Sequence, residues 1–225
     1  MKPSRYKSCI QWYDCLDSTN LEVRRRLSEL DNLSVIASKF QTAGRGQGTH
    51  TWLSPACENL TFTVLLRFGP EGVSPLPATE AVRITQTATL AVFDFLAEEG
   101  IAARIKWPND IWVGDRKICG MLIENILDGA MLSESIVGIG FNLNQKEFDP
   151  ALPNPTSLSL LTGKEYDVPS SLERLHEIIC RQAALLDSTD GRCELEKRFN
   201  EHLFHLDRSS QEQLSKAIEG FEAQK

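Results

Sequence analysis

The chain lacks the features that several classes of protein require. Its six cysteines include no C-x-x-C pair, and their spacing fits neither a zinc site nor a dense disulfide framework. No run approaches the roughly 18 apolar residues of a membrane span, and the first residues lack the apolar core of a signal peptide. Basic residues are fewer than acidic ones, 24 against 31, so the net charge of -7 does not favour nucleic acid or anionic membranes. We therefore expect a cytoplasmic protein that binds neither DNA nor a membrane.

What is present is an ordinary globular composition, with 41% hydrophobic and 24% charged residues in a chain long enough for one sizeable core. Apolar and β-branched runs predict strands at 10–17, 34–40, 59–68, 103–107, 111–125 and 134–144. Helical spacing predicts helices at 19–30, 78–99 and about 170–203. Gly100 should end the second helix, and Gly114-Asp115 should form a tight hairpin turn. Strands in the middle with helices on both sides predict an α+β domain with a mixed sheet.

The most unusual stretch is TAGRGQGTHTW, from Thr42 to Trp52. Its alternating glycines leave backbone N–H groups free to converge on an anion, and Arg45 adds a planar set of donors for carboxylate or phosphate. The loop is neither a G-x-G-x-x-G motif, because position 49 is threonine, nor a P-loop, because no Gly-Lys-Ser/Thr follows. A flexible surface hairpin accounts for the spacing as well.

Three shorter polar segments accompany the loop: DSTN at 17–20, KWPND at 106–110 and DRK at 115–117. Each has a purely structural interpretation. Thr19 and Glu22 predict a T-x-x-E capping box, which leaves the Ser18 hydroxyl available to a polar ligand. Pro-Asn-Asp is typical of a turn. Gly120, inside an apolar strand, indicates that another group approaches closely.

The chain resembles the biotin protein ligases in six segments that occur in the same order: DSTN, QTAGRGQGTHTWLSP, ENLTFTVLL, KWPND, DRKICGMLIE and GIGFNLN. The resemblance covers roughly residues 14–161 and continues weakly to about 206. It implies an α+β catalytic domain, a mixed sheet flanked by helices akin to class II aminoacyl-tRNA synthetases, over residues 1–206. Residues 207–225 would be a tail, or the start of a small C-terminal barrel domain that is cut short.

The resemblance also implies an activity. The family joins biotin to ATP, with Mg²⁺, to give biotinyl-5'-AMP and pyrophosphate, and then transfers the biotinyl group to one lysine of the biotin carboxyl carrier protein of an acyl-CoA carboxylase. Family members include monomers and homodimers, so both states stay open. Because the catalytic pattern begins by Asp14, no N-terminal helix-turn-helix is expected, and regulation by DNA binding is not expected either.

Individual residues take roles through the same resemblance. Biotin would be bound by Ser18, Thr19, Asn20, Gln41, Gly44, Arg45, Gly46, Gln47, Trp52 and Lys117. ATP and the adenylate would be bound by Arg45, Gln47, Lys106, Lys117 and Asn142. The catalytic residues would be Arg45, Lys106, Asp110 and Lys117. Attack of the biotin carboxylate on the α-phosphorus builds negative charge that cations stabilise, and Asp110 would be the carboxylate beside Mg²⁺.

Two features of the loop carry further expectations. Gln47 and His50 stand where relatives commonly carry basic residues, so we expect weaker retention of biotinyl-AMP. The glycines would let the loop be disordered without ligand and close over it, which excludes water. Two other functions stay open: a lipoate or octanoate ligase, which shares the architecture, and a biotin-binding module without catalysis.

Overall fold

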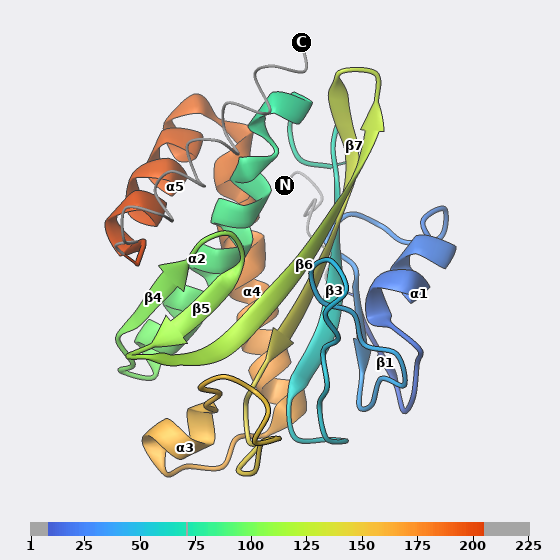
Figure 1. Ribbon diagram of the computed structural model, residues 1–225. Coiled ribbons are helices and arrows are strands. Elements are labelled where there is room, and N and C mark those ends of the chain that lie inside the picture. Colours follow the sequence, from blue (N-terminus) through green and yellow to red (C-terminus); the bar gives the residue numbers. More distant parts are fainter. Residues whose placement is uncertain (1–8, 71, 205–225) are drawn as a thin grey trace.

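The sheet at the centre of the fold has seven strands, and the computed structural model describes it within residues 9–70 and 72–204 (Figure 1). Their order across the sheet is β1-β2-β3-β7-β6-β5-β4. Their bounds are β1 (Ile10–Tyr13), β2 (Val35–Ser38), β3 (Leu60–Arg67), β4 (Ala103–Lys106), β5 (Asp110–Val113), β6 (Arg116–Asp128) and β7 (Met131–Phe141). Strands β1 and β2 pair in parallel and the other neighbours pair antiparallel, so the sheet is mixed, as predicted.

Helices cover the two faces of the sheet unequally (Figure 1). The helices are α1 (Thr19–Arg25), α2 (Val82–Glu98), α3 (Leu158–Thr162), α4 (Val168–Ala184) and α5 (Thr189–His202), with short 3-10 turns at 78–80 and 185–187. Helices α2, α4 and α5 pack over one face on the main core, which includes Phe62, Phe95 and Phe141. Helix α1 covers a smaller cluster on the other face, around Leu65 and Ile136. The α1 face is therefore free to hold a site beside the helix.

Side chains alternate between these two layers along each strand, which explains the division. On β3, Phe62 and Val64 belong to the main core, whereas Leu65 belongs to the cluster under α1. The expected end of the second helix is confirmed, because Gly100 follows α2 with φ +75°, and Gly114 forms the β5–β6 turn with φ +59°. None of the helices in the described part of the chain has the length and apolar content that a membrane crossing requires.

Two predictions about helices were wrong in detail, and one helix was not predicted. Helix α1 ends at Arg25 rather than near Leu30, and only turns follow it. The segment 170–203 is two helices, because the chain turns at Leu185–Asp187 and Ser188 caps α5 by accepting a hydrogen bond from the Gly191 N–H. Helix α3 lies directly after the proline-rich connector and was not predicted. The tail at 207–225 and the boundary at 206 lie outside the described residues, so the division into domains stays a prediction.

The capping box at the start of α1 was also predicted wrongly. Ser18 occupies the N-cap position, without a capping hydrogen bond from its side chain, and Thr19 is already helical. Glu22 forms an ion pair with Arg25. The Thr19 hydroxyl contacts Gln41 and Thr63, so long-range contacts to the loop and to β3 have replaced the local motif.

Candidate active site

A cavity of about 550 Å³ lies on the α1 face of the sheet, above β3, β7 and β6. Small residues in register form its floor. Gly140 of β7 lies between Thr61 of β3 and Gly120 of β6, and Gly138 lies opposite Leu122. Because Gly120, Gly138 and Gly140 carry no side chain, other groups can approach the backbone of the sheet at these positions.

The two glycines of β7 each make room for one large side chain. A Cβ atom on Gly138 would lie 2.1 Å from Asn20 Oδ1, and one on Gly140 would lie 2.2 Å from the Trp52 indole. The indole N–H of Trp52 is buried and has no hydrogen-bond partner among the described residues, so a bound ligand can supply the acceptor. Of the three glycines on this floor, only Gly120 was predicted from the sequence to allow a close approach. Alternating glycines inside an apolar strand are the signal that would have found the other two.

The neutral end of the cavity is a hydrogen-bonded cluster at the start of α1. The Gln41 side-chain oxygen accepts from the Thr19 backbone N–H (2.8 Å) and hydroxyl (3.1 Å). The buried Thr63 hydroxyl lies 2.8 Å from Thr19 Oγ1 and 2.6 Å from Asn20 Oδ1. Ser18 is only 2% exposed, yet its hydroxyl has no hydrogen-bond partner in the part of the chain that the structure describes. That hydroxyl is therefore available to a polar group in the cavity.

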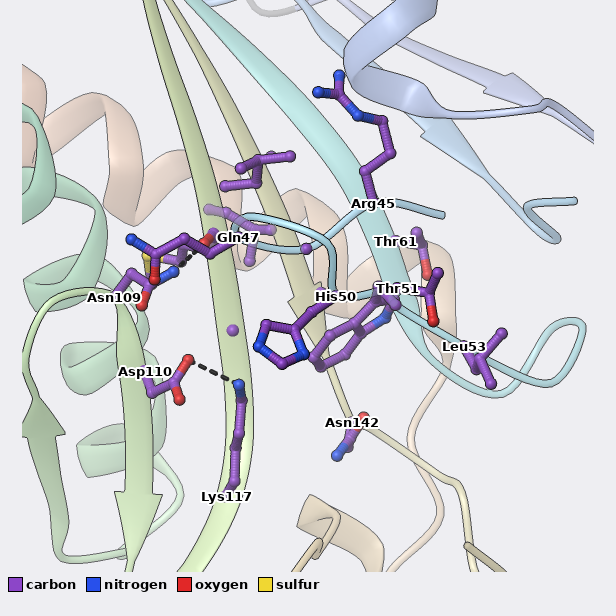
Figure 2. A pocket seen from close by; sticks show the side chains of 18 of the residues that line it. Arg45, Gln47, His50, Thr51, Leu53, Thr61, Asn109, Asp110, Lys117 and Asn142 are labelled. Atoms are coloured by element: carbon purple, nitrogen blue, oxygen red, sulfur yellow. Dashed lines mark hydrogen bonds and ion pairs between the residues drawn. The ribbon is translucent and has the colours of Figure 1, made fainter. Parts of the chain in front are cut away.

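The charged end lies where β4, β5 and β6 run together. Lys117 Nζ lies 2.7 Å from Asp110 Oδ1 and 5.9 Å from the centre of the Trp52 ring (Figure 2). Lys106 Nζ lies 4.2 Å from the centre of the Trp112 ring. The electron-rich face of this ring attracts the ammonium group. Two lysines and one carboxylate give this end a net positive charge, which suits an anionic ligand.

The KWPND segment is fastened to the floor by its asparagine. The Asn109 side chain donates to the Met121 carbonyl, and the Asn109 carbonyl accepts from the Met121 N–H at 3.0 Å. These two bonds fix the turn between β4 and β5 against β6. They thereby fix the positions of Lys106 and Asp110, which lie opposite each other in the β4–β5 pairing. From the sequence, Asn109 was predicted only to form a turn.

The glycine loop forms a compact hairpin of its own. The Gly46 N–H donates to the His50 carbonyl (2.8 Å), and the Trp52 N–H donates to the Gly44 carbonyl (3.0 Å). A Cβ atom on Gly44 would lie 2.2 Å from the Trp52 carbonyl oxygen, and Gly48 has φ +63°. The hairpin itself therefore requires glycine at 44 and favours it at 48.

Arg45 leaves this hairpin in an unexpected direction. Its guanidinium lies 3.3 Å from Glu124 Oε1, on the side of α1 and away from Lys117 and Asp110 (Figure 2). Glu124 lies on β6 and was not among the predicted site residues. In the sequence, nothing marked Glu124 as a site residue except that it ends the DRKICGMLIE segment.

Asn142 lies at the end of β7, where the chain leaves the sheet. Its side-chain N–H donates to the Thr156 carbonyl at 2.9 Å, which holds the amide against the loop that follows. Among the described residues its side-chain oxygen has no hydrogen-bond partner, so it can accept a bond from a ligand.

The structure brings twelve of the thirteen predicted site residues to this one cavity: Ser18, Thr19, Asn20, Gln41, Arg45, Gly46, Gln47, Trp52, Lys106, Asp110, Lys117 and Asn142. Gly44 does not line it, because it is buried behind the Trp52 backbone. Residues of the connector that the sequence analysis missed also contribute: Phe148, Leu152, Pro153 and Pro155. Apart from Gly44 and from Arg45, whose guanidinium pairs with Glu124 away from Lys117 and Asp110, the placement makes the predicted roles geometrically compatible with one another. All of these roles stay predictions.

The donor set for a metal ion is sparse. No group of three or more His, Cys, Asp or Glu side chains that could hold a metal occurs within residues 9–70 and 72–204. Asp110 is the carboxylate at the charged end of the cavity. Mg²⁺ commonly uses one or two carboxylates together with phosphate oxygens and water, so a single aspartate fits an ion that arrives with a nucleotide.

This site combines neutral hydrogen-bonding groups at one end with lysines and a carboxylate at the other, which suits a small acid beside a phosphate. Residues 12–142 match the Biotin/lipoate A/B protein ligase family, and the chain belongs to that family.

The relatives are more specific. A biotin--[acetyl-CoA-carboxylase] ligase of Paracoccus denitrificans is 34% identical over 179 residues, which cover 76% of this chain and 72% of the relative. The bifunctional ligase/repressor BirA of Bacillus subtilis is 30% identical over 204 residues, and the match covers 86% of this chain but 54% of BirA. Among solved structures, the biotin protein ligase of Aquifex aeolicus in complex with biotin and ATP is 26% identical, with a TM-score of 0.73 over 89% of this chain and 80% of that one. These matches confirm the resemblance and the fold class.

Proposed function

We propose that the protein activates biotin with ATP to biotinyl-5'-AMP and transfers the biotinyl group to a lysine of the biotin carboxyl carrier protein of an acyl-CoA carboxylase. The observation that carries the proposal is the single cavity with a neutral polar end and a cationic end. The relative solved with biotin and ATP supports it. We also keep the expectation of a cytoplasmic enzyme, monomer or homodimer, whose catalytic domain extends to about residue 206.

The two ends of the cavity suit the two parts of biotin. The ureido ring is neutral but polar, so it needs hydrogen-bond partners in a site that excludes water. The Ser18 hydroxyl and the Gln41 side chain lie at the neutral end and can supply them. The carboxylate would then extend under Trp52 towards Lys117, whose Nζ lies 5.9 Å from the centre of that ring.

Activation is an exchange of bonds at phosphorus. A carboxylate oxygen attacks the α-phosphorus of ATP, the new O–P bond forms, and the bond to pyrophosphate breaks. Lys117 and Lys106 would stabilise the negative charge that grows on the phosphate oxygens. Asp110 would hold Mg²⁺ together with phosphate oxygens, and the ion would add positive charge there. Asn142 would accept a hydrogen bond from the adenine amino group.

Transfer needs no nucleophile from the enzyme. The lysine amine of the carrier attacks the acyl carbon of the mixed anhydride, AMP leaves with its oxygen, and the amine loses a proton. The enzyme's task is to keep water from the anhydride until the lysine arrives.

Biotin-dependent exchange of labelled pyrophosphate into ATP tests the proposal, followed by transfer of biotin to a carrier domain. We expect exchange with biotin and little with lipoate or octanoate. Exchange with lipoate alone would show the related acyl ligase. Tight binding of biotin without exchange would show a binding module.

We expect trypsin to cleave after Arg45 more slowly when biotin and ATP are both present. The loop would close over the two ligands and exclude water, and ordered segments resist proteolysis. Lys164, which lies in the exposed connection between α3 and α4, provides an internal control. Equal cleavage after Arg45 with and without ligands would contradict loop closure.

We expect Gln47→Arg to slow the release of biotinyl-AMP by roughly tenfold, since one hydrogen bond from a charged donor contributes about 1.5 kcal/mol. Gln47 lines the cavity, whereas Thr49 on the same loop does not. Thr49→Arg is therefore a matched control that adds the same charge outside the site. The release rate would be measured by chasing labelled adenylate with unlabelled biotin, and an unchanged rate in Gln47→Arg would refute the expectation.

A further inference from the structure

Glu124 is the point where three separate segments meet on the cavity face of β6. Its Oε2 accepts from the Asn20 side chain at 2.9 Å. Its two oxygens lie 3.3 and 3.4 Å from Arg45 Nη1, and Oε1 lies 3.5 Å from Arg24 Nη2. The Glu124 side chain is 20% exposed, whereas those of Arg45 and Arg24 are 43% and 44% exposed, so these are partly hydrated ion pairs of modest strength.

The partners of Glu124 belong to different functional parts of the site. Asn20 lies at the neutral end. Its side-chain oxygen accepts a hydrogen bond from Thr63, and its amide group also donates to the Leu122 carbonyl. Arg45 belongs to the glycine hairpin, and its ion pair with Glu124 joins this hairpin to β6. Glu124 therefore connects the neutral end of the cavity to the loop that borders it.

The direction of the Arg45 side chain distinguishes two possible roles for Arg45: binding the biotin carboxylate directly, or holding the hairpin through Glu124. A direct ligand of the biotin carboxylate would be expected to point towards the charged end of the cavity, whereas Arg45 points towards α1 (Figure 2). Its backbone meanwhile bridges Thr51 within the hairpin. The side chain is thus placed to tie the hairpin to Glu124 of β6, which in turn contacts α1 through Asn20 and Arg24.

We propose that Glu124 is a positioning residue that anchors Arg45, and through it the loop 44–52, against the sheet. The identity of the ligand rests on the proposed function, but the anchor itself does not. Since Glu124 acts through the loop, its loss affects ligands that occupy the cavity whether or not they carry a carboxylate.

Glu124→Gln tests this anchor, because glutamine keeps the shape and can still accept from Asn20 but loses the charge that holds Arg45. Glu134→Gln on β7 is a matched control. Glu134 is similarly buried and lies 3.0 Å from Arg67 in an ion pair that is outside the cavity. Without any ligand, we expect hydrogen exchange of the Gly46 and Trp52 amides to become about fivefold faster in Glu124→Gln only. Exchange along β3 and β7 should not change. Unchanged exchange in the loop would overturn the proposal.

Ligand binding gives the second measurement. We expect the Kd of biotin and that of biotinamide, which lacks the charge, to rise by the same factor, roughly three- to tenfold. Arg45→Gln should match Glu124→Gln, and the double variant should be no worse than either. An effect confined to biotin would show that Arg45 binds the carboxylate directly and would overturn the anchor. If the wild-type protein binds neither compound, the proposed function fails, and loop exchange still decides on the anchor.

Discussion

Replacing Lys117 by methionine is expected to lower the rate of biotin-dependent pyrophosphate exchange by about 100- to 1000-fold, the usual effect of removing one donor that stabilises transition-state charge. Lys117 lies at the charged end of the cavity, on the side of Trp52. Its Nζ is 2.7 Å from Asp110 and 5.9 Å from the centre of the Trp52 ring, and in the proposed function it would contact both the biotin carboxylate and the α-phosphate. Methionine keeps most of the length of the side chain and removes only the charge. It also leaves Asp110 without its partner and takes the charged end from a net positive charge to none, so this end attracts an anion less.

A matched control separates this effect from the loss of an ion pair as such. Lys39 lies 2.7 Å from Asp14, the same distance as in the Lys117 pair, but outside the cavity. Lys39→Met should therefore exchange pyrophosphate at the wild-type rate. The Kd of biotin should rise in Lys117→Met, because the carboxylate loses a cation. Exchange at the wild-type rate in Lys117→Met would place the reacting atoms elsewhere.

The sequence predicted the sheet and most of the site because their signals are local. Neighbouring residues alone are enough to predict the strands with β-branched runs, the hairpin at Gly114 and the KWPND turn. The family resemblance then identified which polar residues would share one cavity, and the structure places all of them there except Gly44.

The remainder depends on contacts between distant residues. Thr19 would cap its own helix in isolation, but Gln41 and Thr63 are 22 and 44 positions away and compete successfully for its hydroxyl. Glu124 is 79 positions from Arg45, and nothing local marks either one as the partner of the other. Predicting that pair requires the register of β6 and the path of the loop, which only the folded chain provides.

Gly140→Ala is expected to raise the Kd of biotin by roughly 5- to 150-fold, the range that corresponds to overpacking by about 1–3 kcal/mol. The new methyl group would lie 2.2 Å from the Trp52 indole. Gly140 does not have a positive φ, so alanine introduces no backbone strain. It also pairs with Thr61 and Gly120 across regular strands, where a side chain is otherwise acceptable. The substitution should therefore displace Trp52 without disrupting the fold, and the melting temperature should change little.

A double variant determines whether the clash with Trp52 is the cause. Trp52→Leu alone should weaken biotin binding, because the wall of the cavity and the unpaired indole N–H are both lost. In that background the methyl group of Gly140→Ala has room, so the second substitution should have little further effect. If the two effects instead add in full, Gly140 would be required by the ligand itself, which would then approach the bare backbone of β7. The same measurement thus distinguishes a glycine that seats a tryptophan from a glycine that contacts biotin.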